Sequence, residues 1–195
     1  MNNTSMNKGF TLVELVIGIV VLAIAMMVMN TMLISQSKDA LEPLYRLRAS
    51  QLGQSILQDI LSRQYDQNSE HNGGRYRCDE IWGDTDLWFD GTAWQTGGTP
   101  TPVACSTAYG IDRGEIAGEH QSFNDVDDFV TAGFQSAVTY GDLLGNNLPA
   151  QYNNYAVQIV ISADNSSGLL MKRIDVSIRT PSDEQIVFSA LKGNY

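Results

Sequence analysis

One apolar block near the start of the chain, residues 10–29, limits what the rest of the sequence can form. Only Thr11 and Glu14 interrupt these twenty residues with polar side chains. As an α-helix rising 1.5 Å per residue, the block would be about 30 Å long, which matches the hydrocarbon core of a bilayer. No small-residue cleavage site follows it, so the block predicts a membrane-spanning helix that is kept rather than a secretory signal peptide that is removed.

Glu14 is the residue that a plain membrane anchor does not explain. A charged side chain at the centre of a spanning helix costs about 2.5–3.5 kcal/mol, and less near an interface. Ionisable residues inside a span mark functional sites and pair with a group of opposite charge. We therefore expect Glu14 to have a function, with a cation held at the same depth as its partner.

The residues from Lys8 to Leu15, KGFTLVEL, together with the apolar stretch after them, resemble the class III signal of type IV prepilins and type II secretion pseudopilins. The resemblance implies that a prepilin peptidase cleaves between Gly9 and Phe10 and methylates Phe10 as the new N-terminus. It also implies that Glu14 pairs with the Phe10 amine of a neighbouring subunit, where the two charges neutralise each other. Lys8 favours a cytoplasmic N-terminus, which places the later domain in the periplasm before assembly and on a cell-surface pilus afterwards.

Residues 31–65 are expected to continue the same helix. Apolar residues recur there at three- and four-residue spacing, which is typical of a helix with one buried face: Leu44, Leu47, Leu52, Ile56, Leu57, Ile60 and Leu61. A helix over residues 10–65 would be roughly 80 Å long, which is too long for a globular core alone. Its first half must therefore lie in lipid or against other subunits, as the resemblance to pilins also implies.

The C-terminal part of the sequence predicts a three-stranded antiparallel meander over residues 155–191. Its three strand-like runs are 155–162, 169–179 and 186–191, separated by turn-forming segments. In the middle run, Ile174, Val176 and Ile178 alternate with polar residues, so one face of the sheet is expected to be buried. We expect this sheet to pack on the apolar face of the helix, which gives an α+β, pilin-like fold.

The sequence thus predicts four parts: a leader peptide at 1–9, a transmembrane or filament-core half of the helix at 10–30, an amphipathic half at 31–65, and a head at 66–195. Within the head, Cys78 and Cys105 have no CxxC spacing and no neighbouring histidine, which argues against a zinc site. Because the head follows a membrane span, we expect the two thiols to form a disulfide that closes the loop 78–105. All three tryptophans lie in this loop, where they could form a local core or a binding face for a sugar or a partner.

The charge distribution argues against nucleic-acid binding. The net charge is −10, and residues 79–142 contain twelve acidic residues against one base, Arg113. Such a surface repels phosphate backbones and favours solubility. Two acidic runs are candidate calcium loops, one with Asp84 and Asp86 and the other with Asp125 and Asp127, although neither has the EF-hand spacing and both can equally be solvated turns. The sequence predicts no other cofactor.

The C-terminal residues 187–195 and the Asp-rich run 123–129 resemble minor pilins of the mannose-sensitive haemagglutinin (MSHA) pilus, of the MshD type. This resemblance implies a structural subunit rather than an enzyme, which initiates or caps a pilus used in adhesion and biofilm formation. Its partners would be the inner membrane, a prepilin peptidase, a platform protein with its assembly ATPase, and other pilins. The alternatives are a type II secretion pseudopilin and, more remotely, a membrane-anchored periplasmic enzyme or sugar-binding module.

Overall fold

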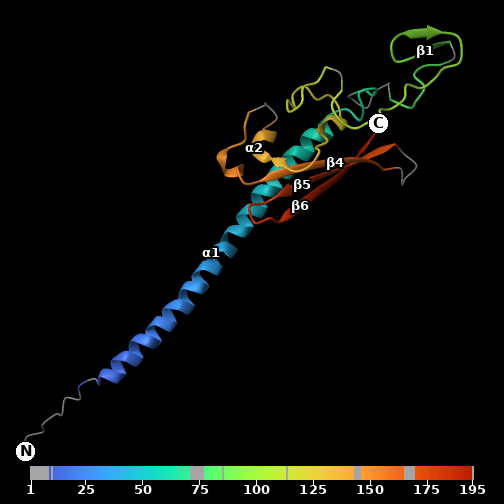
Figure 1. Ribbon diagram of the computed structural model, residues 1–195. Helices are drawn as coiled ribbons and strands as arrows, with labels where there is room; N and C mark the ends of the chain where they lie inside the picture. The colour runs from blue at the N-terminus through green and yellow to red at the C-terminus, as the bar shows by residue number, and fades with distance from the viewer. Residues whose placement is uncertain are drawn as a thin grey trace, which may run out of the picture. The chain divides into compact units, whose positions relative to one another are not determined.

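A computed structural model gives the fold of the chain (Figure 1). The structure describes residue 9 and residues 11–70, 77–84, 86–112, 114–142, 146–164 and 170–194, without the side chains of 33–39. The chain divides into two compact units, Met1–Leu44 and Tyr45–Tyr195. One long helix, α1 (Leu12–Ser62), begins in the first unit and ends in the second, and Pro43 lies inside it.

The first turn of α1 shows why the helix begins where it does. Thr11 precedes the helix, and its hydroxyl accepts a hydrogen bond from the backbone N–H of Glu14 at 3.3 Å. A threonine before the first turn and a glutamate three residues later form the sequence pattern of a capping box. Glu14 also lies in the turn where the helix dipole favours a negative charge. Thr11 and Glu14 are therefore suited to start this helix, whatever else Glu14 does.

In the second unit, α1 packs against one face of an antiparallel sheet, which confirms the expected α+β arrangement (Figure 1). The sheet has the order β3-β4-β5-β6, in which a very short first strand precedes three long ones. The strands are β3 (Gln135–Ser136), β4 (Ala156–Asp164), β5 (Met171–Arg179) and β6 (Gln185–Gly193). The three long strands form the expected meander, and each neighbouring pair is antiparallel.

The core lies between α1 and this sheet. As predicted from their alternation, Ile174, Val176 and Ile178 of β5 are fully buried, and on β4 the residues Val157 and Ile159 are buried beside them. The helix contributes Ala49, Leu52, Ile56 and Ile60. Burial of apolar side chains on both elements supplies the main driving force for folding of the head.

The predicted apolar face of the helix is wrong at Leu44 and Leu47, which are 39% and 56% exposed. Leu47 lies nine residues before Ile56, and at 3.6 residues per turn these two side chains point in opposite directions. Gly53 of the same helix lies close against the sheet. A Cβ atom there would lie 2.4 Å from the ring of Phe188 on β6, so a small residue is needed for the helix to pack at this distance.

The segment between α1 and the main sheet contains short elements joined by turns. They are the hairpin β1 (Leu87–Phe89) and β2 (Trp94–Thr96), the 3₁₀-helix η1 (Asp127–Phe129), the helix α2 (Ala137–Tyr140) and the 3₁₀-helix η2 (Ala150–Tyr152). In the hairpin turn, one carboxylate oxygen of Asp90 accepts the N–H groups of Thr92 and Ala93, both at 2.8 Å. These bonds lower the pKa of Asp90 below its ordinary value.

Candidate functional site

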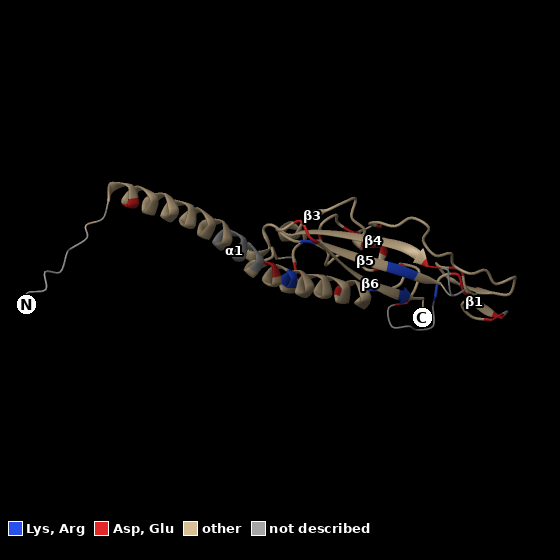
Figure 2. Cartoon of the chain, turned by 90° about the horizontal axis from the view of Figure 1, so that it is seen from below, with Lys and Arg blue, Asp and Glu red and all other residues tan. Residues whose placement is uncertain are grey.

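The first candidate functional region is the apolar part of α1. Residues Leu12–Met32 are long and apolar enough to cross a membrane, and none of them is buried inside the protein. Glu14 is the only charged residue among them, and Figure 2 shows this part of the helix as almost free of charge. The segment is a candidate membrane anchor, because a fully exposed apolar helix needs either lipid or other proteins to cover it.

The side chain of Glu14 is exposed on this helix. Among the residues that the structure describes, no basic group lies within ion-pair distance of its carboxylate. Gly9, on one side of the expected cleavage site, is also exposed. Phe10, the residue expected to become the methylated N-terminus, and residues 1–8 of the leader lie outside the described residues. The cleavage and the pairing of Glu14 therefore remain predictions.

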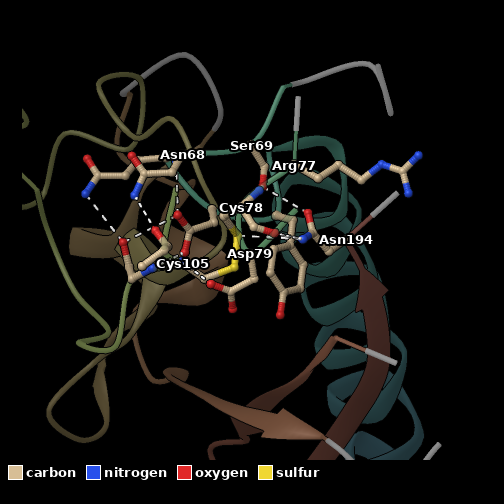
Figure 3. The surroundings of a disulfide bond; sticks show 12 residues. Asn68, Ser69, Arg77, Cys78, Asp79, Cys105 and Asn194 are labelled. Carbon is tan, nitrogen blue, oxygen red and sulfur yellow. Dashed lines mark hydrogen bonds between the residues drawn. A yellow bond between two sulfur atoms is a disulfide. The ribbon is translucent and has the colours of Figure 1, made fainter. Parts of the chain in front are cut away.

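The second candidate region surrounds the two cysteines, which the structure joins in a disulfide (Figure 3). Their Cα atoms are 4.8 Å apart, and Cys78 is fully buried. Two hydrogen bonds accompany the covalent link: the N–H of Asp79 donates to the carbonyl of Val103 at 2.6 Å, and the N–H of Cys105 donates to the side-chain carboxylate of Asp79 at 3.1 Å. The disulfide thus belongs to a hydrogen-bonded seam that closes the loop.

The disulfide is also tied to the C-terminal strand. Asn194 donates from its amide nitrogen to the carbonyl of Cys78 at 2.9 Å, and its amide oxygen accepts a bond from the hydroxyl of Ser69 at 2.9 Å. That hydroxyl also accepts the N–H of Cys78 at 3.1 Å (Figure 3). Because Asn194 lies 125 residues from Ser69 and 116 from Cys78, this network connects the segment after α1 and the disulfide loop with the residue that follows β6.

The loop closed by the disulfide has only part of an aromatic core. Trp82 is buried and stacks on Phe89 with ring centroids 5.3 Å apart. Trp94 approaches the other side of Phe89 at 5.5 Å but is 42% exposed. Trp88 is half-buried and donates from its ring nitrogen to the carbonyl of Gly97 at 2.9 Å. Of the three tryptophans, Trp82 therefore belongs to a local core, Trp88 is half-buried and Trp94 is exposed.

The third region is a buried ion pair that the sequence analysis missed. Lys172 of β5 is 2% exposed, and its Nζ atom lies 2.5 Å from the carboxylate of Asp127 and 3.4 Å from that of Asp66. The same ammonium donates to the carbonyl of Tyr65 at 2.7 Å. The alternation that buries Ile174 continues to Lys172, so the strand pattern did contain the signal for an inward lysine.

Asp66 extends this ion pair to the disulfide loop. It is fully buried, directly after α1, and its carboxylate accepts the N–H of Ser106 at 2.8 Å and the N–H of Asn68 at 3.0 Å. The ammonium of Lys172 therefore compensates the negative charge of Asp66, and the carboxylate of Asp66 also binds the backbone N–H of Ser106, the residue after Cys105. This polar centre connects α1, β5 and the disulfide loop, and its geometry indicates a structural role.

The fourth region is a group of carboxylates beside this centre. One carboxylate oxygen from each of Asp112, Asp125 and Asp128 lies within 4.8 Å of one from each of the others. Burial raises the pKa of Asp125 to about 7, and the nearby charge of Asp127 adds to the shift. Burial, followed by the adjacent carboxyl of Glu115, raises the pKa of Asp128. Ionising these groups is therefore unfavourable in the environment that the protein alone provides.

The four residues considered for calcium do not come together. Asp125 belongs to the carboxylate group just described, whereas Asp127 faces Lys172. Asp84 lies before the hairpin, where one oxygen accepts the N–H groups of Asp86 and Leu87 at 2.9 Å and 3.0 Å. These bonds lower the pKa of Asp84 and make its segment a turn of the Asx type.

Comparison with known proteins gives one match. Residues 4–30 match the family model of the prokaryotic N-terminal methylation motif. No curated protein and no solved structure matches the chain. The matched residues include Gly9, Phe10 and Glu14 together with most of the exposed apolar helix. The chain therefore carries a type IV pilin-like methylation motif at its N-terminus, which indicates a structural protein of the pilin or pseudopilin type.

Proposed function

We propose that this protein is a minor pilin, a structural subunit of a type IV pilus that resembles the MshD subunit of the MSHA pilus. The observation that carries this proposal is the methylation motif over residues 4–30, on a helix whose apolar surface the chain leaves uncovered. Such a helix is stored in the inner membrane and then packs with the helices of other subunits. The head remains in the periplasm before assembly and faces outward from the filament afterwards.

Assembly would depend on two groups at the start of the helix. Cleavage after Gly9 creates a free amine on Phe10, four residues before the carboxylate of Glu14. In a helix that included Phe10 after cleavage, four residues would place the two groups on nearly the same face, about 6 Å apart along the axis. In a filament, the carboxylate of one subunit can accept the amine of the next inside a low-dielectric bundle. That pairing removes the cost of holding each charge in lipid and sets the axial register between subunits.

The head supports a minor role rather than that of the main repeating subunit. Major pilins usually close a disulfide near the C-terminus, whereas Cys78 and Cys105 lie in the middle of this chain. A buried disulfide also suits a domain that folds in the oxidising periplasm. The partners in this scheme are a prepilin peptidase, the platform protein with its assembly ATPase, and other pilins.

The direct test is the chemical state of the N-terminus. We expect mass spectrometry of protein from membranes or sheared filaments to find chains that begin with Phe10 and carry one additional methyl group. A control chain with Gly9→Glu has a different residue before the cleavage site, so the peptidase should not cleave it and the leader should remain. An intact leader in the mature wild-type protein, or a cut after residue 29, would contradict the proposal.

A second measurement separates a pilus from a type II secretion pseudopilus, since the methylation motif occurs in both. Deletion of the gene should remove or reduce surface filaments if the protein is a minor pilin. If filaments persist and export of secreted enzymes stops, the protein is a pseudopilin. Genes for a mannose-sensitive pilus or for a secretion channel beside the gene would point to the same distinction.

A further inference from the structure

Three acidic side chains converge at the junction between two loops of the head. Asp112 belongs to one loop, whereas Asp125 lies two residues before η1 and Asp128 lies within it. One carboxylate oxygen from each lies within 4.8 Å of one from each of the others. Asp125 is fully buried and Asp128 is 2% exposed, while Asp112 is partly exposed to solvent.

Not every buried carboxylate oxygen of this group accepts a hydrogen bond from a described residue. One oxygen of Asp125 accepts the N–H of Asp127 at 2.7 Å, and one oxygen of Asp128 accepts the N–H groups of Asn124 and Asp125 at 3.0 Å. Each of these two carboxylates has a second oxygen, Oδ2 in Asp125 and Oδ1 in Asp128. Among the described residues, no hydrogen-bond donor reaches either of these oxygens. A buried polar atom without a partner is unfavourable, and an unpaired buried charge is more so. Binding of a ligand to these two oxygens would therefore be favourable.

The nearby described cations are already engaged elsewhere. The ammonium of Lys172 lies against Asp127 and Asp66. The guanidinium of Arg63 donates to the carboxylate of Asp59 and to the carbonyls of Phe123 and His120. The group of Asp112, Asp125 and Asp128 thus carries up to three negative charges that these basic side chains do not directly contact.

We propose that Asp112, Asp125 and Asp128 bind a calcium ion in the head. Carboxylate oxygens are the preferred ligands of hard divalent cations, and three of them from a buried site can neutralise an ion of charge +2. Calcium accepts six to eight oxygens in irregular arrangements, so water at the open side near Asp112 can complete its shell. Magnesium requires a nearly ideal octahedron, which suits this uneven arrangement of two buried residues and one partly exposed residue less well.

Binding at this place would connect parts of the head that the sequence separates. Next to Asp125, the N–H of Val126 donates to the carbonyl of Gln64 at 3.1 Å, and the N–H of Gln64 donates to the carbonyl of Asn124 at 3.2 Å. The turn with Asp125 and Asp128 is therefore already attached to the segment that follows α1. An ion shared with Asp112 would attach the loop of Asp112 to the same segment, so calcium should stabilise the head.

The test uses the full chain in detergent after removal of metals with a chelator. A dissociation constant on the order of 0.1 mM would be typical of extracellular calcium sites. At about 10 mM CaCl₂, we expect such binding to raise the thermal midpoint of the head by about 5–10 °C. Isothermal titration calorimetry with CaCl₂ should show one site per chain, and MgCl₂ should give a much smaller effect.

Two variants locate the ion. Asp125→Asn keeps the oxygen that accepts the N–H of Asp127 but removes the charge, so calcium should no longer raise the midpoint. The same change should not lower the midpoint of the calcium-free protein, because it also removes an unpaired buried carboxylate. The matched control is Asp86→Asn, which removes one exposed carboxylate from the other acidic run and should leave the response to calcium intact.

Three results would overturn the proposal. The first is an unsubstituted chain whose midpoint and calorimetric trace do not respond to calcium. The second is a full calcium response in Asp125→Asn, which would place the ion elsewhere. The third is an equal response to MgCl₂, which would indicate a general divalent-cation site rather than the calcium site proposed. Since the experiment needs no filament, its failure would leave the proposed pilin function unaffected.

Discussion

The apolar half of α1 and the head each place a carboxylate in apolar surroundings, but the two regions differ in whether the same chain supplies a basic partner for it. In the head, Asp127 is buried and meets Lys172 of the same chain at 2.5 Å. On the apolar helix, Glu14 has no basic partner among the described residues, and the apolar side chains around it are exposed. Residues of the head therefore pair the buried carboxylate of Asp127 themselves. The segment Leu12–Met32, in contrast, needs other molecules to cover its apolar surface and to pair the charge of Glu14.

This difference suggests how to separate folding from assembly in experiments. Changes in the head should alter its stability without affecting membrane insertion, because its contacts lie within one compact unit. Changes in the first part of α1 should alter assembly without affecting the stability of the head. The following predictions test this separation, beginning with the largest expected effect.

Replacing Lys172 with methionine should destabilise the head the most. The substitution leaves the carboxylates of Asp127 and Asp66 buried without their shared cation. Loss of one partner of a buried ion pair costs about 3–5 kcal/mol of unfolding free energy. Urea unfolding followed by tryptophan fluorescence would measure it. The control is Lys192→Met, since Lys192 is partly buried and, among the described residues, its ammonium donates to the carbonyl of Leu61 and to no carboxylate. Equal losses in the two variants would show that the ion pair has no special role.

Replacing both cysteines with serine should cost slightly less. The two residues are 27 positions apart, and closing a loop of this size stabilises a fold by roughly 3–4 kcal/mol on the chain-entropy account. The same unfolding assay would detect the loss, and insertion of the helix into membranes should stay unchanged. The wild-type chain under reducing conditions serves as the control. A double variant as stable as the oxidised protein would mean that the hydrogen bonds of the loop suffice.

Glu14→Ala should lower recovery of the protein in sheared filaments at least tenfold, which corresponds to about 1.4 kcal/mol, while leaving insertion, cleavage and head stability intact. Glu14→Gln separates the two roles of this residue, because glutamine can also serve in a capping box but carries no charge. If pairing with the amine of Phe10 matters, the glutamine variant should fail like the alanine variant. Normal recovery of Glu14→Gln would instead assign Glu14 to helix capping. Glu119→Ala, at an exposed position in the head, is the control.

The smallest effect is expected from a pair of glycines in the same helix. Gly53→Ala adds a methyl group 2.4 Å from the ring of Phe188, so the ring must move. Overpacking costs about 1–3 kcal/mol, and alanine returns up to about 1 kcal/mol of helix propensity. We expect a net loss of about 1 kcal/mol in chemical unfolding. At Gly18 an added Cβ has no neighbour within 4 Å, so Gly18→Ala should not destabilise the head. A loss at Gly18 as large as at Gly53 would contradict the separation of the two parts.

Periodicity suffices to predict the elements of this fold but not its polar centres. The helix and the three long strands repeat apolar residues at regular intervals, so their burial can be read from the sequence, apart from Leu44 and Leu47, which are exposed. Lys172 is different, because a lysine in a strand is ordinarily expected at the surface. The grouping of Asp112 with Asp125 depends on two loops without periodicity, so only the folded chain brings these residues together.

The full burial of Cys78 has a consequence for the order of events during biogenesis. A thiol at this position in a finished head would be out of reach of an oxidase, so the bond has to form while the head is still open. The cysteines are 27 residues apart, whereas Lys172 must meet Asp66 across 106 residues. Closing a short loop is entropically easier than making a long-range contact. Oxidation of the loop should therefore precede docking of the last strands, and a shortage of periplasmic oxidant would delay maturation at that step.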